Sequence, residues 1–218
     1  MVHGRPVIGL AGGIGSGKST VGRILADMGC LVTDSDAAGR AALRDPRIRD
    51  QLVDWWGPRV LDEAGAIDRR AVARIVFADA AERAKLETLT HPWIEAERRR
   101  QWAAAPPQAV AFVIDAPLLI EAGLAAQCDA VIFVEADRQR RLERIHRTRG
   151  WDEGELTRRE LSQMPLDAKR RRADYVIENN GDLDQLTERV RQVLSDIVKI
   201  SQQDAAPPPR RSALRPYE

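Results

Sequence analysis

The sequence predicts an α/β fold with a five-stranded parallel sheet, because short apolar runs alternate with longer segments of helical periodicity. Short, wholly apolar runs are typical of strands that helices cover on both faces. A glycine-rich segment from Gly12 to Ser19 follows the first run directly and fits the pattern G-x-x-x-x-G-K-S of a phosphate-binding loop, or P-loop. The expected strands are Val7–Ala11, Leu31–Thr33, Val110–Ile114, Val131–Glu135 and Tyr175–Ile177.

Composition limits the classes of function. With 218 residues the chain suffices for one well-buried core, and its formal net charge of +1 gives no argument for a nucleic-acid or membrane partner. No apolar stretch approaches the roughly 20 residues that span a bilayer, and the first residues do not resemble a signal peptide. Cys30 and Cys128 belong to no C-x-x-C pair, which favours free thiols. We expect a cytoplasmic monomer or weak homo-oligomer.

The glycine-rich loop is expected to bind the phosphates of a nucleoside triphosphate. Its glycines let backbone N–H groups turn toward phosphate oxygens, and the helix that begins near Lys18 directs its positive end at the same anion. Lys18 is one of four lysines in an arginine-rich chain, and Ser19 is a candidate Mg²⁺ ligand. A turn without a ligand is the alternative. The expected ATP contacts here are Gly13, Ile14, Gly15, Ser16, Gly17, Lys18, Ser19 and Thr20.

The helical segments divide into two blocks. We expect one P-loop domain over residues 1–201, whose core comprises 6–36, 109–136 and 173–200. Residues 37–105 contain no convincing strand and are expected to form a helical insertion that binds the acceptor substrate, and 138–168 a helical lid interrupted at Gly150. Residues 202–218 are rich in proline and arginine, which predicts a disordered tail.

Acidic residues follow two of the expected strands. Asp34 and Asp36 come after the second strand, and Asp115 ends the most hydrophobic one. Parallel strands end at one edge of a sheet, where open α/β folds bind ligands. In phosphoryl transfer one carboxylate accepts the proton of the attacking hydroxyl, while another orients it or holds Mg²⁺. We expect Asp115 to hold the metal with Ser19. Helix capping or a turn is the alternative for each acid.

Six arginines lie between residues 138 and 149, where Glu143 is the only acid. One or two of them would suit a lid that neutralises charge on a transferred phosphoryl group, and we select Arg144 and Arg149. Arg147 is an alternative to Arg149. The other arginines of this helix are expected on the surface.

Two features are candidates for the acceptor side. His91 precedes Pro92, which disfavours helical conformation at position 91, so we expect a helix to end there with His91 facing the cleft. A structural histidine is the alternative. After Asp115, the segment Pro117–Leu119 has the character of an apolar wall.

Together these motifs resemble those of the dephospho-CoA kinase family. The resemblance runs in colinear order from about residue 7 to 200. The combination of D-x-D, H-P and P-L-L-x-E is far more specific than the P-loop alone. The segments that carry it are GLAGGIGSGKS at 9–19, DSD at 34–36, THP at 90–92, DAPLLIE at 115–121, Gln163 ahead of Lys169, and ADYVIENNG at 173–181.

The resemblance implies a P-loop kinase that uses ATP and Mg²⁺ to phosphorylate the ribose 3′-hydroxyl of dephospho-CoA, the last step of coenzyme A synthesis. It implies Asp36 as the general base, with Lys18 and Arg144 stabilising the transferred phosphoryl group. It also implies that Arg149 belongs to the lid and that Asn180 lies near the adenine of ATP. The acceptor-binding residues it implies are His91, Pro117, Leu118, Leu119 and Glu121.

Other classes remain as alternatives at this stage. Another small-molecule P-loop kinase would use the same loop with a different acceptor pocket. A GTP-dependent switch would need an N-K-x-D segment after a late strand, and Asn179-Asn180-Gly181-Asp182 lacks the lysine. The run Lys169–Arg172 offers a weak nucleic-acid patch, because no aromatic residues are interleaved with it.

Overall fold

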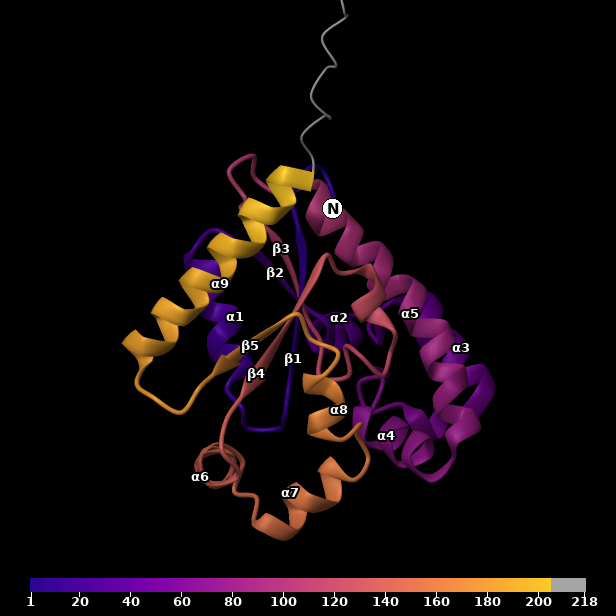
Figure 1. Ribbon diagram of the computed structural model, residues 1–218. Coiled ribbons are helices and arrows are strands. Elements are labelled where there is room, and N and C mark those ends of the chain that lie inside the picture. Colours follow the sequence, from indigo (N-terminus) through magenta and orange to yellow (C-terminus); the bar gives the residue numbers. More distant parts are fainter. Residues whose placement is uncertain (205–218) are drawn as a thin grey trace, which may run out of the picture.

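The computed structural model describes residues 1–204 and contains one five-stranded parallel sheet in the order β2-β3-β1-β4-β5 (Figure 1). The α/β class and the five parallel strands expected from the sequence are confirmed. The third strand begins two residues later than expected. The strands are β1 (Val7–Gly12), β2 (Leu31–Asp34), β3 (Phe112–Asp115), β4 (Ala130–Glu135) and β5 (Tyr175–Glu178).

The strand order places β1 at the centre of the sheet, between β3 and β4. β1 therefore separates one half of the sheet, β2 and β3, from the other half, β4 and β5. The loop that follows β1 lies at the position where open α/β folds usually bind ligands. Asp34 and Asp115 occupy equivalent register positions at the ends of β2 and β3. The edge of the sheet thus brings together two carboxylates that lie far apart in the sequence.

Helices cover both faces of the sheet. Helices α1 (Lys18–Asp27) and α9 (Leu183–Asp204) pack on one face, and their apolar stripes join the strands in one hydrophobic core (Figure 1). The opposite face is covered by the end of α5 (Ala80–Ala103), the short helix η2 (Leu124–Gln127) and α8 (Leu166–Arg170).

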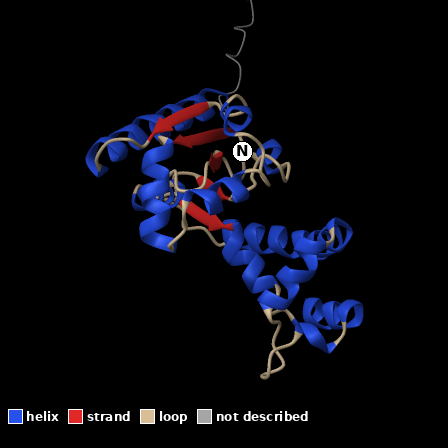
Figure 2. Ribbon diagram, turned by 90° about the horizontal axis from the view of Figure 1, so that it is seen from below, coloured by secondary structure: helices blue, strands red, loops and turns tan. Residues whose placement is uncertain are grey.

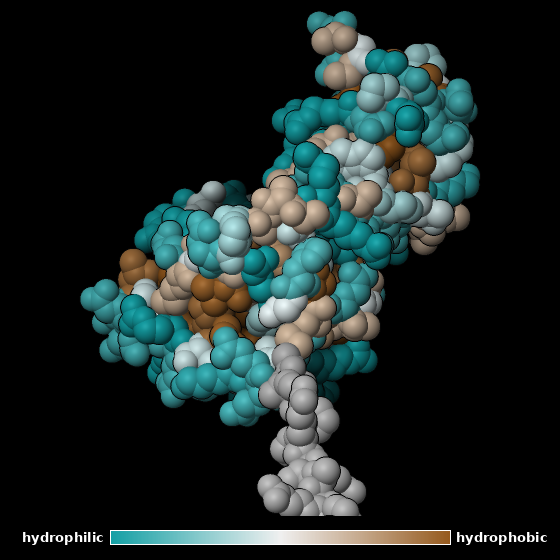
Figure 3. Space-filling view, turned by 90° about the horizontal axis from the view of Figure 1, so that it is seen from above, coloured by the Kyte–Doolittle hydropathy of each residue, from teal (hydrophilic) through white to brown (hydrophobic). Residues whose placement is uncertain are grey.

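Four α-helices and one short 3₁₀ helix between β2 and β3 form a second body with its own hydrophobic cluster. It projects from the sheet in Figure 2, and Figure 3 shows two lobes whose surface is mostly hydrophilic with apolar patches. The cluster includes Leu52, Trp56 and Val72, so the segment buries apolar side chains independently of the sheet. The elements are α2 (Ser35–Ala42), α3 (Pro46–Trp56), the short helix η1 (Pro58–Val60), α4 (Arg69–Ala78) and α5.

The expectation that a helix ends at His91 is wrong, because α5 continues through Pro92 to Ala103. Pro92 cannot donate a hydrogen bond to the carbonyl of Thr88. Thr88 is exposed, so water can satisfy that carbonyl, while Thr90 and residues farther along α5 are buried against neighbouring elements. Packing on both sides of Pro92 therefore outweighs its local preference.

Two further helices connect β4 to α8. Helix α6 (Arg138–Arg149) ends at Gly150, whose φ is 68°, and α7 (Glu153–Glu160) begins after Asp152, whose carboxylate accepts a hydrogen bond from the Glu155 backbone N–H at 2.8 Å. The interruption at Gly150 agrees with the sequence pattern.

The expected tail begins inside α9, which continues through Asp204, and its remaining residues, 205–218, lie outside the described part. The apolar stripe of α9 extends to Ile197, and the helix continues seven residues farther. Among the helices of residues 1–204, none combines the length and apolar character needed to cross a membrane.

Candidate active site

The P-loop connects β1 to the first turn of α1 and is closely packed by other elements. Gly15 and Gly17 have φ values of 78° and 92°, in the left-handed region that favours glycine. A Cβ on Gly17 would lie 2.1 Å from the side-chain nitrogen of Asn179, and one on Gly15 would lie 2.7 Å from the carbonyl oxygen of Arg141. The hydroxyl of Ser16 is buried and has no hydrogen-bond partner in the described residues. The loop therefore requires glycine for conformation and for space.

Lys18 forms an ion pair with Asp115 at the end of β3. Both side chains are mostly buried, and the pair lies beside the P-loop and the N-terminus of α1. The sequence pattern assigned Asp115 to a metal shared with Ser19. In the structure the carboxylate contacts the P-loop lysine, while Ser19 is exposed at the first turn of α1.

Asp34 and Asp36 lie at the start of α2, and the structure gives them different surroundings. Asp34 is the N-cap of α2 and accepts a hydrogen bond from the Ala37 backbone N–H at 2.9 Å, so the capping interpretation applies to it. The guanidinium of Arg40 lies 3.7 Å from the same carboxylate. Asp36 lies in the first turn, and partial desolvation together with the like charge of Asp34 raises its pKa above the ordinary value, against the opposing effects of Lys18 and Arg40.

Arg144 of α6 binds the P-loop backbone directly. Its Nη1 donates to the carbonyl of Ser16 at 3.1 Å, and its Nη2 donates to the carbonyl of Asn179 at 2.8 Å. Burial lowers the pKa of Arg144, which remains a cation at neutral pH. The sequence-predicted arginine is therefore beside the phosphate-binding loop.

Asn179 is a site residue that sequence reasoning missed. Its side-chain amide donates to the Ser16 carbonyl at 2.8 Å, and the residue is buried. Sequence reasoning selected the next residue, Asn180, whose side-chain oxygen instead accepts from the Asp137 backbone N–H at 2.9 Å. The sequence feature that could have indicated Asn179 is the pair Asn179-Asn180 directly after a strand. Such a pair does not show which of the two side chains points into the protein.

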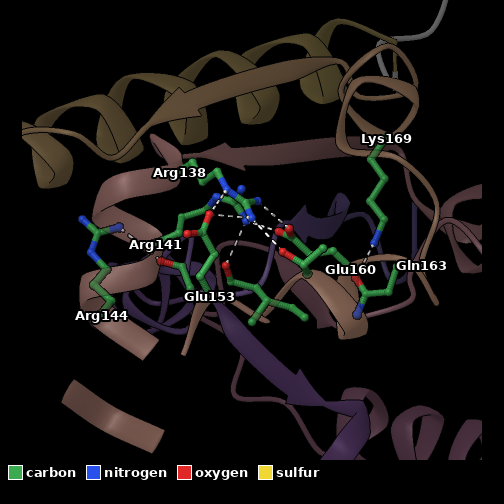
Figure 4. A network of polar contacts seen from close by, with 10 residues as sticks. Arg138, Arg141, Arg144, Glu153, Glu160, Gln163 and Lys169 are labelled. Atoms are coloured by element: carbon green, nitrogen blue, oxygen red, sulfur yellow. Dashed lines mark hydrogen bonds and ion pairs between the residues drawn. The ribbon is translucent and has the colours of Figure 1, made fainter. Parts of the chain in front are cut away.

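Arg141 also contacts the P-loop, so its expected place on the surface is wrong. The residue is buried, and its Nη1 donates to the carbonyl of Ile14 at 3.3 Å and forms an ion pair with Glu160 of α7. Arg138 joins the same carboxylate at 3.1 Å and also contacts Glu153, as Figure 4 shows. These contacts hold α7 against α6 next to the P-loop.

Arg149 lies at the end of α6 and is exposed, away from the P-loop backbone contacts made by Arg144. Its guanidinium carbon lies 4.8 Å from the ring centre of Trp151, and that of Arg159 lies 4.0 Å from the same ring. Arg147 is exposed as well. Neither candidate for the lid arginine is drawn into the P-loop in this structure.

The segment after β3 divides its side chains between core and surface. Leu119 is buried under β1, where its side chain would meet a Cβ on Gly9, so it does not form the expected open wall. Leu118 is exposed and Pro117 partly so, which leaves these two available to a ligand. Leu119 is buried because it packs closely against Gly9 of β1. The sequence pattern alone could not show which of the two leucines is buried.

Glu121 is held in place by the base of the lid region. It pairs with Lys169 at 2.8 Å and accepts a hydrogen bond from the Met164 backbone N–H at 3.1 Å. Burial would raise the pKa of Glu121, but the hydrogen bonds from Lys169 and backbone amides outweigh it and lower the pKa. Lys169 is 1% exposed and also donates to Gln163 at 3.1 Å (Figure 4), so it cannot belong to a basic surface patch.

A cleft of about 260 Å³ lies beside the acids, between α2 and α5. Asp34 is at its border, and small side chains of α2 form part of its wall. His91 lies one turn before Ile94 on α5, and Ile94 lines this cleft. Its lining is Thr33, Asp34, Ser35, Ala37, Ala38, Ala41, Ile94, Glu97, Arg98 and Gln101.

Comparisons with known proteins identify the family. The family model described as dephospho-CoA kinase matches residues 6–185. The chain belongs to the dephospho-CoA kinase family. The membership confirms an enzyme of the kinase class with a P-loop fold, whose reaction is phosphorylation of dephospho-CoA in the final step of coenzyme A synthesis.

Individual relatives agree with this assignment. The chain is 41% identical to a dephospho-CoA kinase of Syntrophotalea carbinolica over 195 residues, covering 88% of this chain and 92% of the relative. It is 38% identical to one of Corynebacterium glutamicum, covering 87% and 98%. A solved structure, TT1252 from Thermus thermophilus, is 33% identical with a TM-score of 0.78, covering 88% of this chain and 97% of that one.

Proposed function

We propose that this kinase transfers the γ-phosphoryl group of ATP to the ribose 3′-hydroxyl of dephospho-CoA, giving coenzyme A and ADP. The observation that carries the proposal is the meeting, at one sheet edge, of an anion-binding loop with Lys18 and the carboxylates of Asp34, Asp36 and Asp115. Such a site holds a polyphosphate next to a proton acceptor, which is what transfer to an alcohol requires.

Asp36 acts as the general base in this proposal. The 3′-hydroxyl gives its proton to the Asp36 carboxylate, the oxygen bonds to the γ-phosphorus, and the bond from that phosphorus to the bridging oxygen of ADP breaks. The raised pKa of Asp36 brings the base closer to neutral pH, where proton transfer is more favourable. Asp34 supports it by fixing the first turn of α2.

Lys18 and Arg144 stabilise the transferred group electrostatically. Lys18 lies at the positive end of α1, and its partner Asp115 holds the ammonium at the sheet edge. Arg144 holds the loop carbonyls of Ser16 and Asn179, so its charge is positioned before substrate binds. Arg149 would act from the lid, and Asn180, in the loop after β5, would lie near the adenine of ATP.

The residues present fit a Mg²⁺ ion bound with ATP. Ser19 supplies an exposed hydroxyl and Asp115 a carboxylate, which are hard oxygen donors of the kind Mg²⁺ prefers. When bound, the ion neutralises negative charge on the phosphates. Ser19 and Asp115 would hold it from the protein side.

The acceptor would bind between the α2–α5 cleft and the segment after β3. Leu118 and Pro117 offer apolar surface, and Glu121 fixes the segment through Lys169. His91 is exposed on α5, one turn before the cleft residue Ile94. ATP and dephospho-CoA are the proposed small-molecule partners. The free thiols of Cys30 and Cys128 support a cytoplasmic location.

A coupled ADP-release assay tests the substrate assignment. Purified protein with Mg²⁺-ATP would be offered dephospho-CoA, AMP, CMP and gluconate in parallel. We expect turnover with dephospho-CoA to exceed the others by orders of magnitude. Equal turnover with AMP or gluconate would contradict the proposed acceptor while leaving the kinase assignment intact.

A further inference from the structure

Arg98 is a buried cation at the wall of the α2–α5 cleft. It is 5% exposed, and its guanidinium Nε is buried with no hydrogen-bond partner in residues 1–204. The neighbouring arginines Arg99 and Arg100 pair with Glu95 and Glu97, whereas no carboxylate of the described residues pairs with Arg98.

The contacts that Arg98 does make are neutral. Its Nη2 donates to the side-chain oxygen of Gln127 at 2.9 Å, and its guanidinium carbon lies 5.6 Å from the ring centre of Trp102. Burying a guanidinium is costly unless opposite charge compensates it, and burial accordingly lowers the pKa of Arg98. An anion arriving in the cleft would supply the missing compensation.

The cleft connects this cation to the reacting atoms. Asp34 and Ser35, next to the proposed base Asp36, line the same cleft as Arg98. In dephospho-CoA the 5′-carbon that carries the diphosphate is two bonds from the carbon that bears the 3′-hydroxyl. An acceptor whose 3′-hydroxyl reaches Asp36 therefore carries its diphosphate close by.

We propose that Arg98 forms an anion subsite that binds the 5′-diphosphate of the acceptor and so selects nucleotide-like alcohols over uncharged ones. This inference rests on the proposed function. Glu97 also lines the cleft, but Arg100 bonds to both of its carboxylate oxygens at 2.8 Å, so its charge is compensated. Arg98 is the cleft cation whose charge remains available to a ligand.

The test compares two acceptors in the full-length enzyme. Adenosine carries the same base and 3′-hydroxyl as dephospho-CoA but lacks the diphosphate. Arg98→Met keeps most of the aliphatic stem and removes the charge. We expect KM for dephospho-CoA to rise roughly 10- to 100-fold, the loss of a charge-assisted hydrogen bond, with the KM for ATP and the kcat/KM for adenosine changed less than about twofold.

Arg99→Met is the matched control, because Arg99 is the next residue, its side chain is 74% exposed and it pairs only with Glu95 on the surface. This variant should match wild type with both acceptors. An equal loss of kcat/KM with dephospho-CoA and adenosine in Arg98→Met would overturn the subsite and assign Arg98 a purely structural role. An unchanged KM for dephospho-CoA would overturn it as well.

Two further measurements keep the inference testable. If Arg98→Met does not fold, judged by its melting curve, Arg98→Lys replaces it. A loss of kcat/KM confined to dephospho-CoA supports the subsite, and equal losses with both acceptors oppose it.

If wild type does not phosphorylate dephospho-CoA, the proposed function fails. Calorimetric binding of dephospho-CoA with the P-loop saturated by a non-hydrolysable ATP analogue then decides the subsite: at least tenfold weaker binding to Arg98→Met supports it, and unchanged binding excludes it.

Discussion

Lys18 at the start of α1 forms an ion pair with Asp115 at the end of β3, although 97 residues separate them in the chain. The pair exists because β1 and β3 are neighbours in the sheet, with Leu10 opposite Asp115. It holds the P-loop ammonium beside the acids of β2 and α2. Substitution of either member should therefore affect both phosphate binding and stability, which kinetics and melting curves measure separately.

Lys18→Met should lower kcat/KM for ATP by roughly 10²- to 10³-fold, because a preorganised charge beside the phosphates is lost. It also leaves Asp115 without its cation, so a small loss of stability is expected. Steady-state kinetics with a melting curve measure both effects. Lys85→Met, which breaks an exposed pair with Glu82, is the control and should leave both unchanged. Full activity of Lys18→Met would contradict the loop assignment.

Asp36→Asn should lower kcat by roughly 10²- to 10⁴-fold while the affinity for ATP stays near wild type, because the amide cannot accept the hydroxyl proton. The substitution also removes like-charge repulsion with Asp34, so the melting temperature should not fall. Rapid-quench kinetics and nucleotide titration separate the two readouts. Unchanged turnover would exclude Asp36 as the base.

Asp34→Asn distinguishes capping from catalysis. Asparagine is as good an N-cap as aspartate, so α2 should stay intact and the melting temperature should change little. If Asp34 acts only through the cap and its charge, kcat should fall less than about tenfold. A loss as large as that of Asp36→Asn would give Asp34 a direct part in the reaction.

The acid limb of the pH profile should report Asp36. Desolvation and Asp34 raise its pKa, so kcat/KM for the acceptor should decline, as pH falls, at a higher pH than an ordinary aspartate would cause. In Asp34→Asn the like charge is absent and the limb should move to lower pH. The raised pKa also means that ionised Asp36 destabilises the folded state at pH values above it. This destabilisation is relieved as pH falls through the raised pKa. A limb that does not move would point to another base.

Lys169→Ala should be destabilising, by about 1–3 kcal/mol, because it removes a buried ammonium and leaves the partly buried carboxylate of Glu121 without its charged partner. The double variant Glu121→Met with Lys169→Met should recover much of that loss. Urea unfolding measures both. Since the pKa of Glu121 is lowered in the folded protein, its contribution is present at neutral pH and is lost as pH falls through that lowered pKa. A mild effect of Lys169→Ala would mean that the pair is hydrated.

Asn179→Ala should weaken ATP binding roughly 5- to 30-fold, because the Ser16 carbonyl loses the amide that holds the loop against β5. Asn180→Ala is the comparison variant: its side chain contacts the Asp137 N–H and not the P-loop, so its effect on ATP binding should be smaller. Nucleotide titration should rank Asn179→Ala as the weaker binder. The opposite ranking would favour the sequence-based choice of Asn180.

Local patterns determined much of this protein. Apolar runs predicted the five strands, the glycine spacing predicted the P-loop, and the acids that follow two strands predicted the carboxylates at the sheet edge. Each of these signals depends on backbone geometry within a few residues, so a sequence records it directly.

The tertiary structure alone decided the surroundings of side chains whose partners come from distant segments of the chain. It buried Arg141 and Asn179 against the P-loop and placed Leu119 in the core. It also carried α5 through Pro92, and it left Arg98 in the cleft wall with no ion-pair partner among residues 1–204. The physical reason is that burial and pairing energies depend on which strands and helices become neighbours. Helical or strand periodicity assigns a residue to a face, and only packing decides what lies on the other side.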